Sequence, residues 1–251
     1  MVSSPSWTKG EIQRHTRAAK SLGDIKTEVA KYITQKGTSL FESDVLRFIK
    51  SSYKKHGLVN DHKKEFAIVA FGKNTSEVHY FPKGKGVKLK PNTLILLDMW
   101  ARSSENGSPY ADMTWMFWYG SKVPADIQKK WNVLVLSRTK AVTEIEKYLK
   151  KNTLPRGLDI DRASHDVIGH AKYGSSIKHT IGHSLGFNHP HGKLPGINWR
   201  EYSPLSKNIG YTIEPGMYLK DHGFRTEIDF YISNQNKVVI TTPMEQELEI
   251  I

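Results

Sequence analysis

Four carboxylates and one imidazole, each in a short apolar or Gly/Pro-punctuated segment, constrain the fold more than any other feature. They are Asp98 in TLILLDMW, Asp112 in YADMTW, His183 in HTIGHSLGF, Glu214 in YTIEPGMY and Glu227 in FRTEIDFYI. Acidic residues are almost never fully buried unless they are paired, so such segments need compensating positive charge. Oxygen ligands with one imidazole suit two divalent metal ions of the Mn, Co or Zn kind, which activate water for hydrolysis. The alternative is five unrelated residues, each acid capping a strand or pairing with a lysine.

The charge of such a cluster also favours bound metal ions. Four clustered carboxylates would repel one another, and several would have to take up protons. Two divalent cations would balance the four negative charges, so the site becomes nearly neutral when it is loaded. The sequence contains no Cys, which excludes thiolate ligands and a disulfide scaffold. Carboxylate and imidazole chemistry is therefore what we expect.

Composition is that of a globular protein with a Lys-rich surface. A chain of 251 residues can bury a substantial core, and no apolar run suggests a signal peptide or a membrane span, so we expect a cytoplasmic protein. The 37 Lys and Arg against 25 Asp and Glu give a formal net charge of +12, which is compatible with a nucleic-acid partner. Because the basic residues are dispersed, a solvated surface is the favoured interpretation, and a nucleic-acid partner is not expected.

Hydrophobic periodicity predicts a mixture of helices and strands. Helices are expected at 25–33, 40–49 and 160–173, with Gly174 after the last, and a longer helix from Pro124 to a break at 152–157. Strands are expected at 66–72, 93–99, 211–213, 225–232 and 237–243. No linker or repeat interrupts the pattern. The prediction is one α+β domain over residues 1–251.

The segments around the five residues resemble those of metallopeptidases that share the pita-bread fold. The order D … YxDMT … HxxGHxLG … EPGMY … RTE is similar to that of methionine aminopeptidase, aminopeptidase P, prolidase and creatinase. TKGEIQRHTRAAKSLGDIKTEV resembles the opening helices of the family, and LDIDRASHDVIGHAKYG resembles its helix before the metal histidine. The resemblance covers roughly residues 6–245. It implies a curved antiparallel sheet covered by helices.

The resemblance also implies a role for each ligand. Asp98 would hold one metal ion alone, and Asp112 and Glu227 would bridge both ions. His183 and Glu214 would complete the second site. A hydroxide bridging the two ions would attack the peptide bond, and Glu214 would accept a proton from the water that supplies it.

Three further residues match family positions on the substrate side. His79 and His179 match histidines that bind substrate and donate to the charge developing on the tetrahedral intermediate. Arg225 resembles the arginine that accompanies the bridging glutamate in the Xaa-Pro branch. His179 and His183 have the spacing of a zincin helix, but no Glu follows His179 and glycines disfavour a helix there, so we reject that interpretation. A lone histidine is more often a surface or core residue, which is the alternative for each.

The sequence departs from the family pattern near the two aspartates. The spacing from Asp98 to Asp112 is longer than in most members, so ARSSENGSPY is expected to form a longer hairpin loop. Trp115 stands where most members have Arg, which removes a cation and puts the packing there in question.

Two more departures concern the substrate side. Pro190 stands where the family has a further histidine, and either His189 or His191 could serve instead, with His191 slightly favoured. The chain is also expected to lack the amino-terminal domain of aminopeptidase P and prolidase, which commonly shapes the substrate entrance and the oligomer. This weakens the transfer of specificity from those enzymes.

The choice of branch rests on two residues. Tyr80 follows His79 where methionine aminopeptidases have Gly, and Arg225 also favours the Xaa-Pro branch. Creatinase would have lost the metal ligands, whereas all are kept here. We expect a dinuclear exopeptidase that hydrolyses the N-terminal bond of peptides, Xaa-Pro first. A methionine aminopeptidase-like enzyme is the first alternative, and a non-catalytic module binding protein or nucleic acid is the second. The oligomeric state, monomer or homodimer, stays open.

Overall fold

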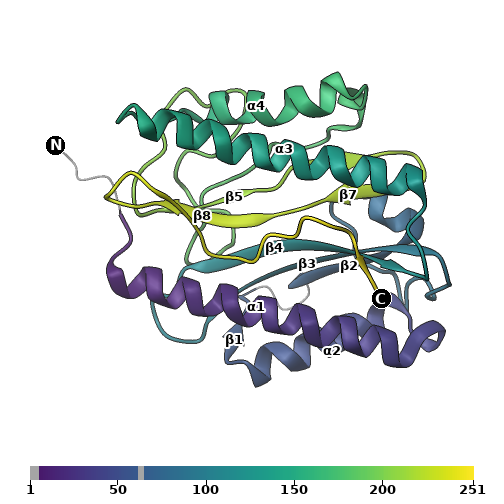
Figure 1. Cartoon of the computed structure of the whole chain (residues 1–251). Helices are drawn as coiled ribbons and strands as arrows, with labels where there is room; N and C mark the ends of the chain where they lie inside the picture. The colour runs from purple at the N-terminus through teal and green to yellow at the C-terminus, as the bar shows by residue number, and fades with distance from the viewer. Residues whose placement is uncertain (1–5, 62–64) are drawn as a thin grey trace.

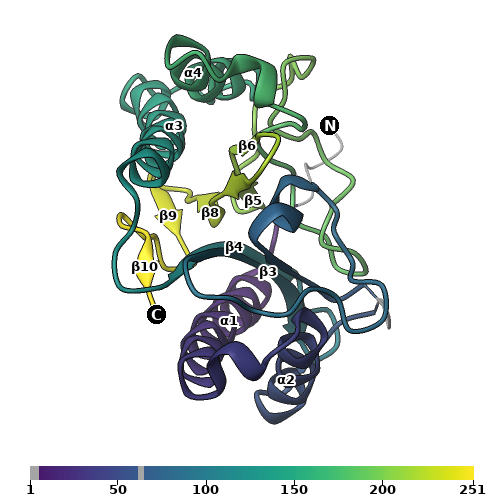
Figure 2. The same cartoon turned by 90° about the vertical axis from the view of Figure 1, so that its right-hand side faces the viewer.

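Two pairs of helices enclose a central stack of strands (Figure 1). The computed structural model describes residues 6–61 and 65–251. The view turned by 90° shows α1 and α2 on one outer face and α3 and α4 on the other (Figure 2). The helices are α1 (Lys9–Lys36), α2 (Glu42–Lys55), α3 (Ala125–Lys150) and α4 (Gly157–His170), with the 3-10 turns η1 (Gly37–Ser39), η2 (Gly72–Ser76) and η3 (Gly174–Ser176).

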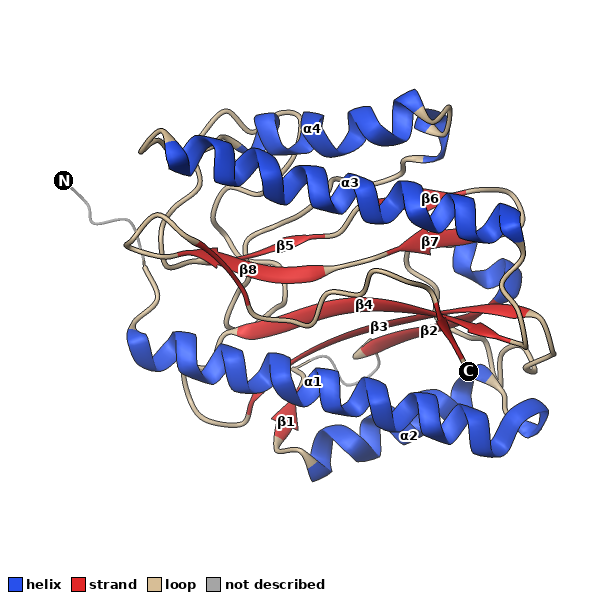
Figure 3. Cartoon of the chain, in the orientation of Figure 1, coloured by secondary structure: helices blue, strands red, loops and turns tan. Residues whose placement is uncertain are grey.

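Three sheets form within residues 6–61 and 65–251, and they lie between the helix layers (Figure 3). One has the order β1-β3-β4-β10 with β2 also paired to β3, one has the order β5-β8-β9, and β6 pairs with β7. The bounds are β1 (Leu58–Val59), β2 (Ala67–Phe71), β3 (Thr93–Ser103), β4 (Tyr110–Tyr119), β5 (Gly210–Ile213), β6 (Gly216–Tyr218), β7 (Gly223–Arg225), β8 (Ile228–Ile232), β9 (Val238–Ile240) and β10 (Glu249–Ile250).

Antiparallel pairing was expected, and it holds for every strand pair of the described chain except one. β10 runs parallel to β4, with Glu249 opposite Phe117. The chain reaches this edge by a crossing segment after β9 rather than by a tight turn, which is what a parallel neighbour requires. The α+β class is confirmed, and the all-antiparallel expectation is corrected at β10.

The hairpin of β3 and β4 forms the centre of the fold. Both strands are nearly continuous apolar runs because both faces of this sheet are covered. Their register places Asp98 opposite Thr114 and Trp100 opposite Asp112. β3 runs to Ser103 and β4 begins at Tyr110. The long loop expected between the aspartates is therefore mostly strand, with a turn over 104–109, because the extra residues continue the β3–β4 ladder.

Trp115 points away from the aspartates, into the core under α1. It is 4% exposed and belongs to the apolar cluster between β3–β4 and the first two helices. The ammonium of Lys26 on α1 lies 5.0 Å from the centre of its ring and pairs with the carboxylate of Glu249 on β10. A cation therefore still lies beside this position, but it comes from α1, as a cation–π contact.

Helix α4 begins and ends three residues earlier than expected. It starts at Gly157, where a Cβ would come within 2.4 Å of the carbonyl oxygen of Gly196, so only glycine lets the two segments touch. It ends at His170, and the left-handed residue after it is Lys172 (φ 66°) instead of Gly174, which opens η3. At α3, Pro124 occupies the N-cap, one residue before the helix.

Candidate metal centre

The five predicted ligands come from both halves of the chain and meet between the sheets. Asp98 lies on β3 and Asp112 on β4, while Glu214 directly follows β5 and Glu227 lies between β7 and β8. His183 lies just before a bridge between Ser184 and Tyr211 of β5. The five residues line one cavity of about 400 Å³.

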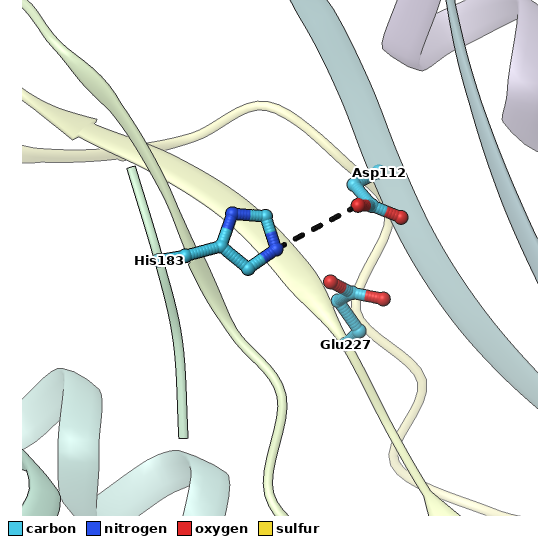
Figure 4. Close-up of side chains that lie close together, drawn as sticks. All are labelled: Asp112, His183 and Glu227. Carbon is cyan, nitrogen blue, oxygen red and sulfur yellow. Dashed lines mark ion pairs between the residues drawn. The ribbon is translucent and has the colours of Figure 1, made fainter. Parts of the chain in front are cut away.

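Strand alternation explains why Asp112 faces this cavity. Successive β4 side chains point to opposite faces, so Asp112 and Thr114 share one face while Met113 and Trp115 pack into the core under α1. One ligand atom each from Asp112, His183 and Glu227 lies within 4.8 Å of the others. Figure 4 shows these three side chains pointing toward one another from three separate segments. Such convergence is what a metal ion requires of its ligands.

The tautomer of His183 leaves a lone pair for this cluster. Its Nδ1 lies 3.0 Å from the carbonyl oxygen of Ser184, to which it donates. Its Nε2 lies 3.4 Å from Oε1 of Glu214 and 3.8 Å from Oδ2 of Asp112. Burial lowers the pKa of His183 to about 3, so the ring is neutral. A neutral imidazole whose outer hydrogen is held by a carbonyl is a typical metal ligand.

The clustered carboxylates repel one another when they are ionised. Burial, followed by the charge of neighbouring acids, raises the pKa of Asp112 and of Glu227 well above the ordinary range. Burial raises the pKa of Glu214 to about 7. Such shifts are the response of buried acids to missing positive charge. The donor set therefore fits divalent cations.

Asp98 differs from the other acids because one of its two carboxylate oxygens is paired with a guanidinium group. Its Oδ2 accepts a hydrogen bond from Nη2 of Arg225, while its buried Oδ1 has no partner among the described residues. Burial raises its pKa, and the positive charge of Arg225 opposes that rise. The free Oδ1 leaves one oxygen for a further ligand.

Arg225 also organises the wall beside Asp98. Its Nε donates to Oγ1 of Thr114 at 3.0 Å, and its Nη1 donates to the hydroxyl of Tyr218 at 2.9 Å. Thr114 in turn donates to Oε2 of Glu227 at 2.9 Å. One cation thus connects two of the predicted ligands through a buried network.

His179 does not line the cavity, but it is hydrogen-bonded to Tyr218, a member of the Arg225 network. Its Nδ1 lies 2.6 Å from the carbonyl oxygen of Thr180, and its Nε2 lies 2.8 Å from the hydroxyl of Tyr218. Burial lowers its pKa to about 3, so the neutral ring donates through Nδ1 and accepts at Nε2 from Tyr218. His179 is therefore connected to the cavity through Tyr218 and Arg225.

The remaining predicted histidines line the cavity directly. His79 is exposed at its rim, and His189 and His191 form another wall. The ring of His191 stacks on that of His183 with centroids 3.9 Å apart, and its backbone N–H donates to Nδ1 of His189 at 3.0 Å. Burial, helped by His189, lowers the pKa of His191. Both candidates for the missing family histidine are therefore present side by side.

Four residues of the site's support were not singled out from the sequence. Thr114 and Tyr218 could have been found from strand alternation and from the EPGMY motif. The carboxylate of Asp229 accepts a hydrogen bond of 2.9 Å from the backbone N–H of Asp112. Glu42 on α2 is fully buried and holds the segment that carries His79. No local sequence pattern indicates the contacts of Asp229 and Glu42, because they join distant parts of the sequence.

Comparisons with known proteins agree with this geometry. The profile of metallopeptidase family M24 matches residues 13–234. An uncharacterized peptidase of Staphylococcus epidermidis is 28% identical over 231 residues, which cover 90% of this chain and 59% of that protein. An Xaa-Pro dipeptidase of Lactobacillus helveticus is 28% identical over 191 residues, covering 76% of this chain and 48% of that protein.

Solved structures show the same fold. The crystal structure of an X-Pro aminopeptidase from Thermotoga maritima superposes with a TM-score of 0.83 at 22% identity, covering 98% of this chain and 64% of that one. The pita-bread expectation is thereby confirmed. The chain spans about three fifths of the length of the S. epidermidis and T. maritima proteins. Within residues 6–61 and 65–251, no helix combines the length and apolarity of a membrane span. The family match and the convergent acids and histidine together place this chain in metallopeptidase family M24.

Proposed function

We propose that the chain is the catalytic domain of a dinuclear metal-dependent exopeptidase that hydrolyses N-terminal Xaa-Pro bonds in peptides, in the cytoplasm. The observation that carries the proposal is the convergence of Asp112, His183 and Glu227 within 4.8 Å in a chain of a metallopeptidase family. The names of the L. helveticus and T. maritima relatives support the preference for proline. Tyr80 and Arg225, which match the Xaa-Pro branch, support it further.

Two divalent ions, Mn, Co or Zn, would be held by the four acids and the imidazole predicted as ligands, all of which line the cavity. When bound, they would polarise the scissile carbonyl and lower the pKa of water at the site. The free Oδ1 of Asp98 and the lone pair of His183 Nε2 are donor atoms suited to such ions. Burial and the neighbouring acids raise the pKa of Asp112 and of Glu227 well above the ordinary range, which supports a site that is stabilised by added positive charge.

Glu214 is the residue to which we assign proton transfer. Its Oε1 accepts the hydroxyl of Thr212 at 3.2 Å and lies 3.4 Å from His183. We therefore assign the transferred proton to Oε2. A carboxyl group whose pKa is raised by burial can both take and return a proton near neutral pH.

We assign substrate orientation to the remaining predicted histidines and to Arg225. His79 at the rim can donate to the developing oxyanion, because its side chain lies on the solvent side of the cavity. Arg225 holds Tyr218 and Asp98 in place by hydrogen bonds. His179 acts behind Tyr218, and His189 and His191 close the remaining side.

Substrate turnover tests this proposal. The chain would be reconstituted with Mn²⁺ or Co²⁺ and assayed on Xaa-Pro dipeptides, Xaa-Pro tripeptides and Met-Ala peptides. Cleavage of Xaa-Pro bonds is the expected result. Cleavage of Met-Ala peptides alone would indicate a methionine aminopeptidase-like enzyme. No cleavage, together with stoichiometric binding of RNA, would indicate the non-catalytic module, for which the net charge of +12 is the supporting feature.

A further inference from the structure

A second cavity adjoins the one that holds the acids. It has a volume of about 450 Å³, against about 400 Å³ for the metal cavity. The side chains of His189 and His191 line both, so these two residues form the shared wall. The second cavity lies between the start of α1 and the turn that follows His183. The two cavities therefore adjoin at these two histidines.

The two cavities differ in chemistry. Acids and histidines dominate the metal cavity, whereas the second is walled by Trp7, Leu185, Phe187, Leu194 and Ile209. Its polar residues include Glu11 and Lys193. A concave apolar surface with a few polar groups at its margin is typical of a binding site.

Phe187 is the side chain that most clearly needs a partner. It is 37% exposed, although it lies in this apolar hollow, and its ring meets that of Trp7 edge-on at 6.3 Å. The carboxylate of Glu11 is already engaged, since its Oε2 accepts the backbone N–H of Thr8 at 2.6 Å in the helix cap. Glu11 therefore offers no free carboxylate to a ligand, and Lys193 is the remaining charged side chain among the apolar residues of this wall.

The hollow is held in shape without a ligand. The backbone N–H of Trp7 donates to the carbonyl oxygen of Asn208 at 2.7 Å, and its ring lies so close to Gly210 that a Cβ there would come within 2.1 Å. The turn bearing Phe187 is closed by a bond of 3.0 Å from the N–H of Gly186 to the carbonyl oxygen of Pro190. A preformed pocket binds with a smaller entropic cost.

We propose that this second cavity binds a bulky apolar side chain on the residue that follows proline in the peptide. The inference rests on the proposed function. An enzyme that cleaves at the amino terminus leaves the peptide only one direction in which to continue, toward its carboxyl end. With the amino-terminal residue and proline placed in the metal cavity, the residue after proline is the next along the peptide, and each residue advances the chain by at most about 3.6 Å. The substrate class is then apolar tripeptides and longer peptides, in preference to dipeptides.

The test compares three peptides, Ala-Pro, Ala-Pro-Gly and Ala-Pro-Phe, on the metal-loaded protein. We expect kcat/KM for Ala-Pro-Phe to exceed that for Ala-Pro-Gly by roughly tenfold, as an apolar side chain gains from a fitting pocket. In Phe187→Ala this ratio should fall toward one. Leu136→Ala is the matched control, since Leu136 is 48% exposed on α3 and lines neither cavity, and it should keep the ratio of the unchanged protein.

The outcomes separate this inference from the proposed function. Hydrolysis of all three peptides with a ratio that Phe187→Ala leaves unchanged would overturn the inference and keep the function. If no peptide is cleaved, the proposed function is wrong. Calorimetric titration of Ala-Pro-Phe and Ala-Pro-Gly into the unchanged protein and into Phe187→Ala then tests binding to the second cavity by itself. Equal or absent binding overturns the inference. A change in sedimentation of Phe187→Ala without a change in the ratio would make this face a contact between copies, and would also overturn it.

Discussion

The carboxylate of Glu42 on α2 accepts the hydroxyl of Tyr80 at 2.7 Å, and this contact fixes the segment that presents the neighbouring His79 to the cavity. The same buried carboxylate accepts three further hydrogen bonds, all between 2.7 and 2.9 Å. Their donors are the backbone N–H of Phe71, the amide of Asn74 and the backbone N–H of Val87. One helix residue thus holds both ends of a surface segment.

Glu42→Gln should loosen this segment. The amide keeps one acceptor oxygen and turns a donor toward two other donors, so buried groups lose their partners. Each such loss costs about 1–3 kcal/mol. Denaturant unfolding should show this loss, and kcat for Xaa-Pro peptides should fall while the metal content is kept. Glu77→Gln, a change at an exposed position within the same segment, serves as the control and should change neither quantity.

Glu227→Ala should reduce metal content and activity together. It removes a carboxylate that faces Asp112 and His183, so bound cations lose compensating charge. The midpoint of thermal unfolding in excess Mn²⁺ should also drop, because a metal bound only to the native state stabilises it by mass action. Elemental analysis after chelation and reconstitution should approach two ions per chain for the unchanged protein. Full metal content in the variant would remove Glu227 from the ligand set.

His79→Ala should separate catalysis from metal binding. The side chain lies at the exposed rim of the cavity, away from the Asp112–His183–Glu227 cluster. Both ions should stay, and turnover should fall on the order of 10²–10³-fold, as for other deleted oxyanion donors. Steady-state kinetics with metal analysis of the same sample provides the measurement. Loss of metal in this variant would contradict the assigned role.

His15 predicts a dependence of stability on pH. The ring is fully buried, 2.8 Å from the carbonyl oxygen of Tyr110 and 2.7 Å from the hydroxyl of Thr241. Burial lowers its pKa from 6.5 to about 4, so the unfolded chain binds the proton more readily. The stabilisation is complete above pH 6.5 and is lost as the pH falls toward 4. Between pH 7.5 and 5 the loss is about 2 kcal/mol.

His15→Gln isolates this contribution, because glutamine can keep both hydrogen bonds and cannot take up a proton in this range. Between pH 7.5 and pH 5, the free energy of unfolding should change by about 2 kcal/mol less favourably in the unchanged protein than in the variant, because the buried acids contribute equally to both. Equal changes in the two proteins would mean that His15 is not responsible.

Sequence patterns predicted the residues whose signal is local. The apolar runs that contain Asp98 and Asp112 predicted β3 and β4, and strand alternation orients Asp112 into the cavity. The convergence of the five candidate ligands was expected from the resemblance, and the structure brings them to one cavity. Their roles as ligands stay predictions.

What sequence could not supply depends on contacts between distant segments. Glu42 looks like an ordinary helix-start acid, and its burial follows only from the packing of α2 on the segment after β2. Asp229 touches the backbone of Asp112 across 117 positions. The end of α4 was misplaced because Lys172 adopts the left-handed conformation that Gly174 would favour intrinsically. Each of these is decided by tertiary packing, which overrides local preference.

The contact of Lys26 and Glu249 beside Trp115 has a consequence for biosynthesis. It joins the first helix to the last strand, against the back of the strand that carries Asp112. A growing chain shorter than Glu227 lacks a member of the acid cluster, and β4 gains its outer neighbour only when Glu249 has been made. Since translation proceeds from the amino end, the complete cluster is available only after Glu227 has been synthesised, and the strand that carries Asp112 gains its outer neighbour later still.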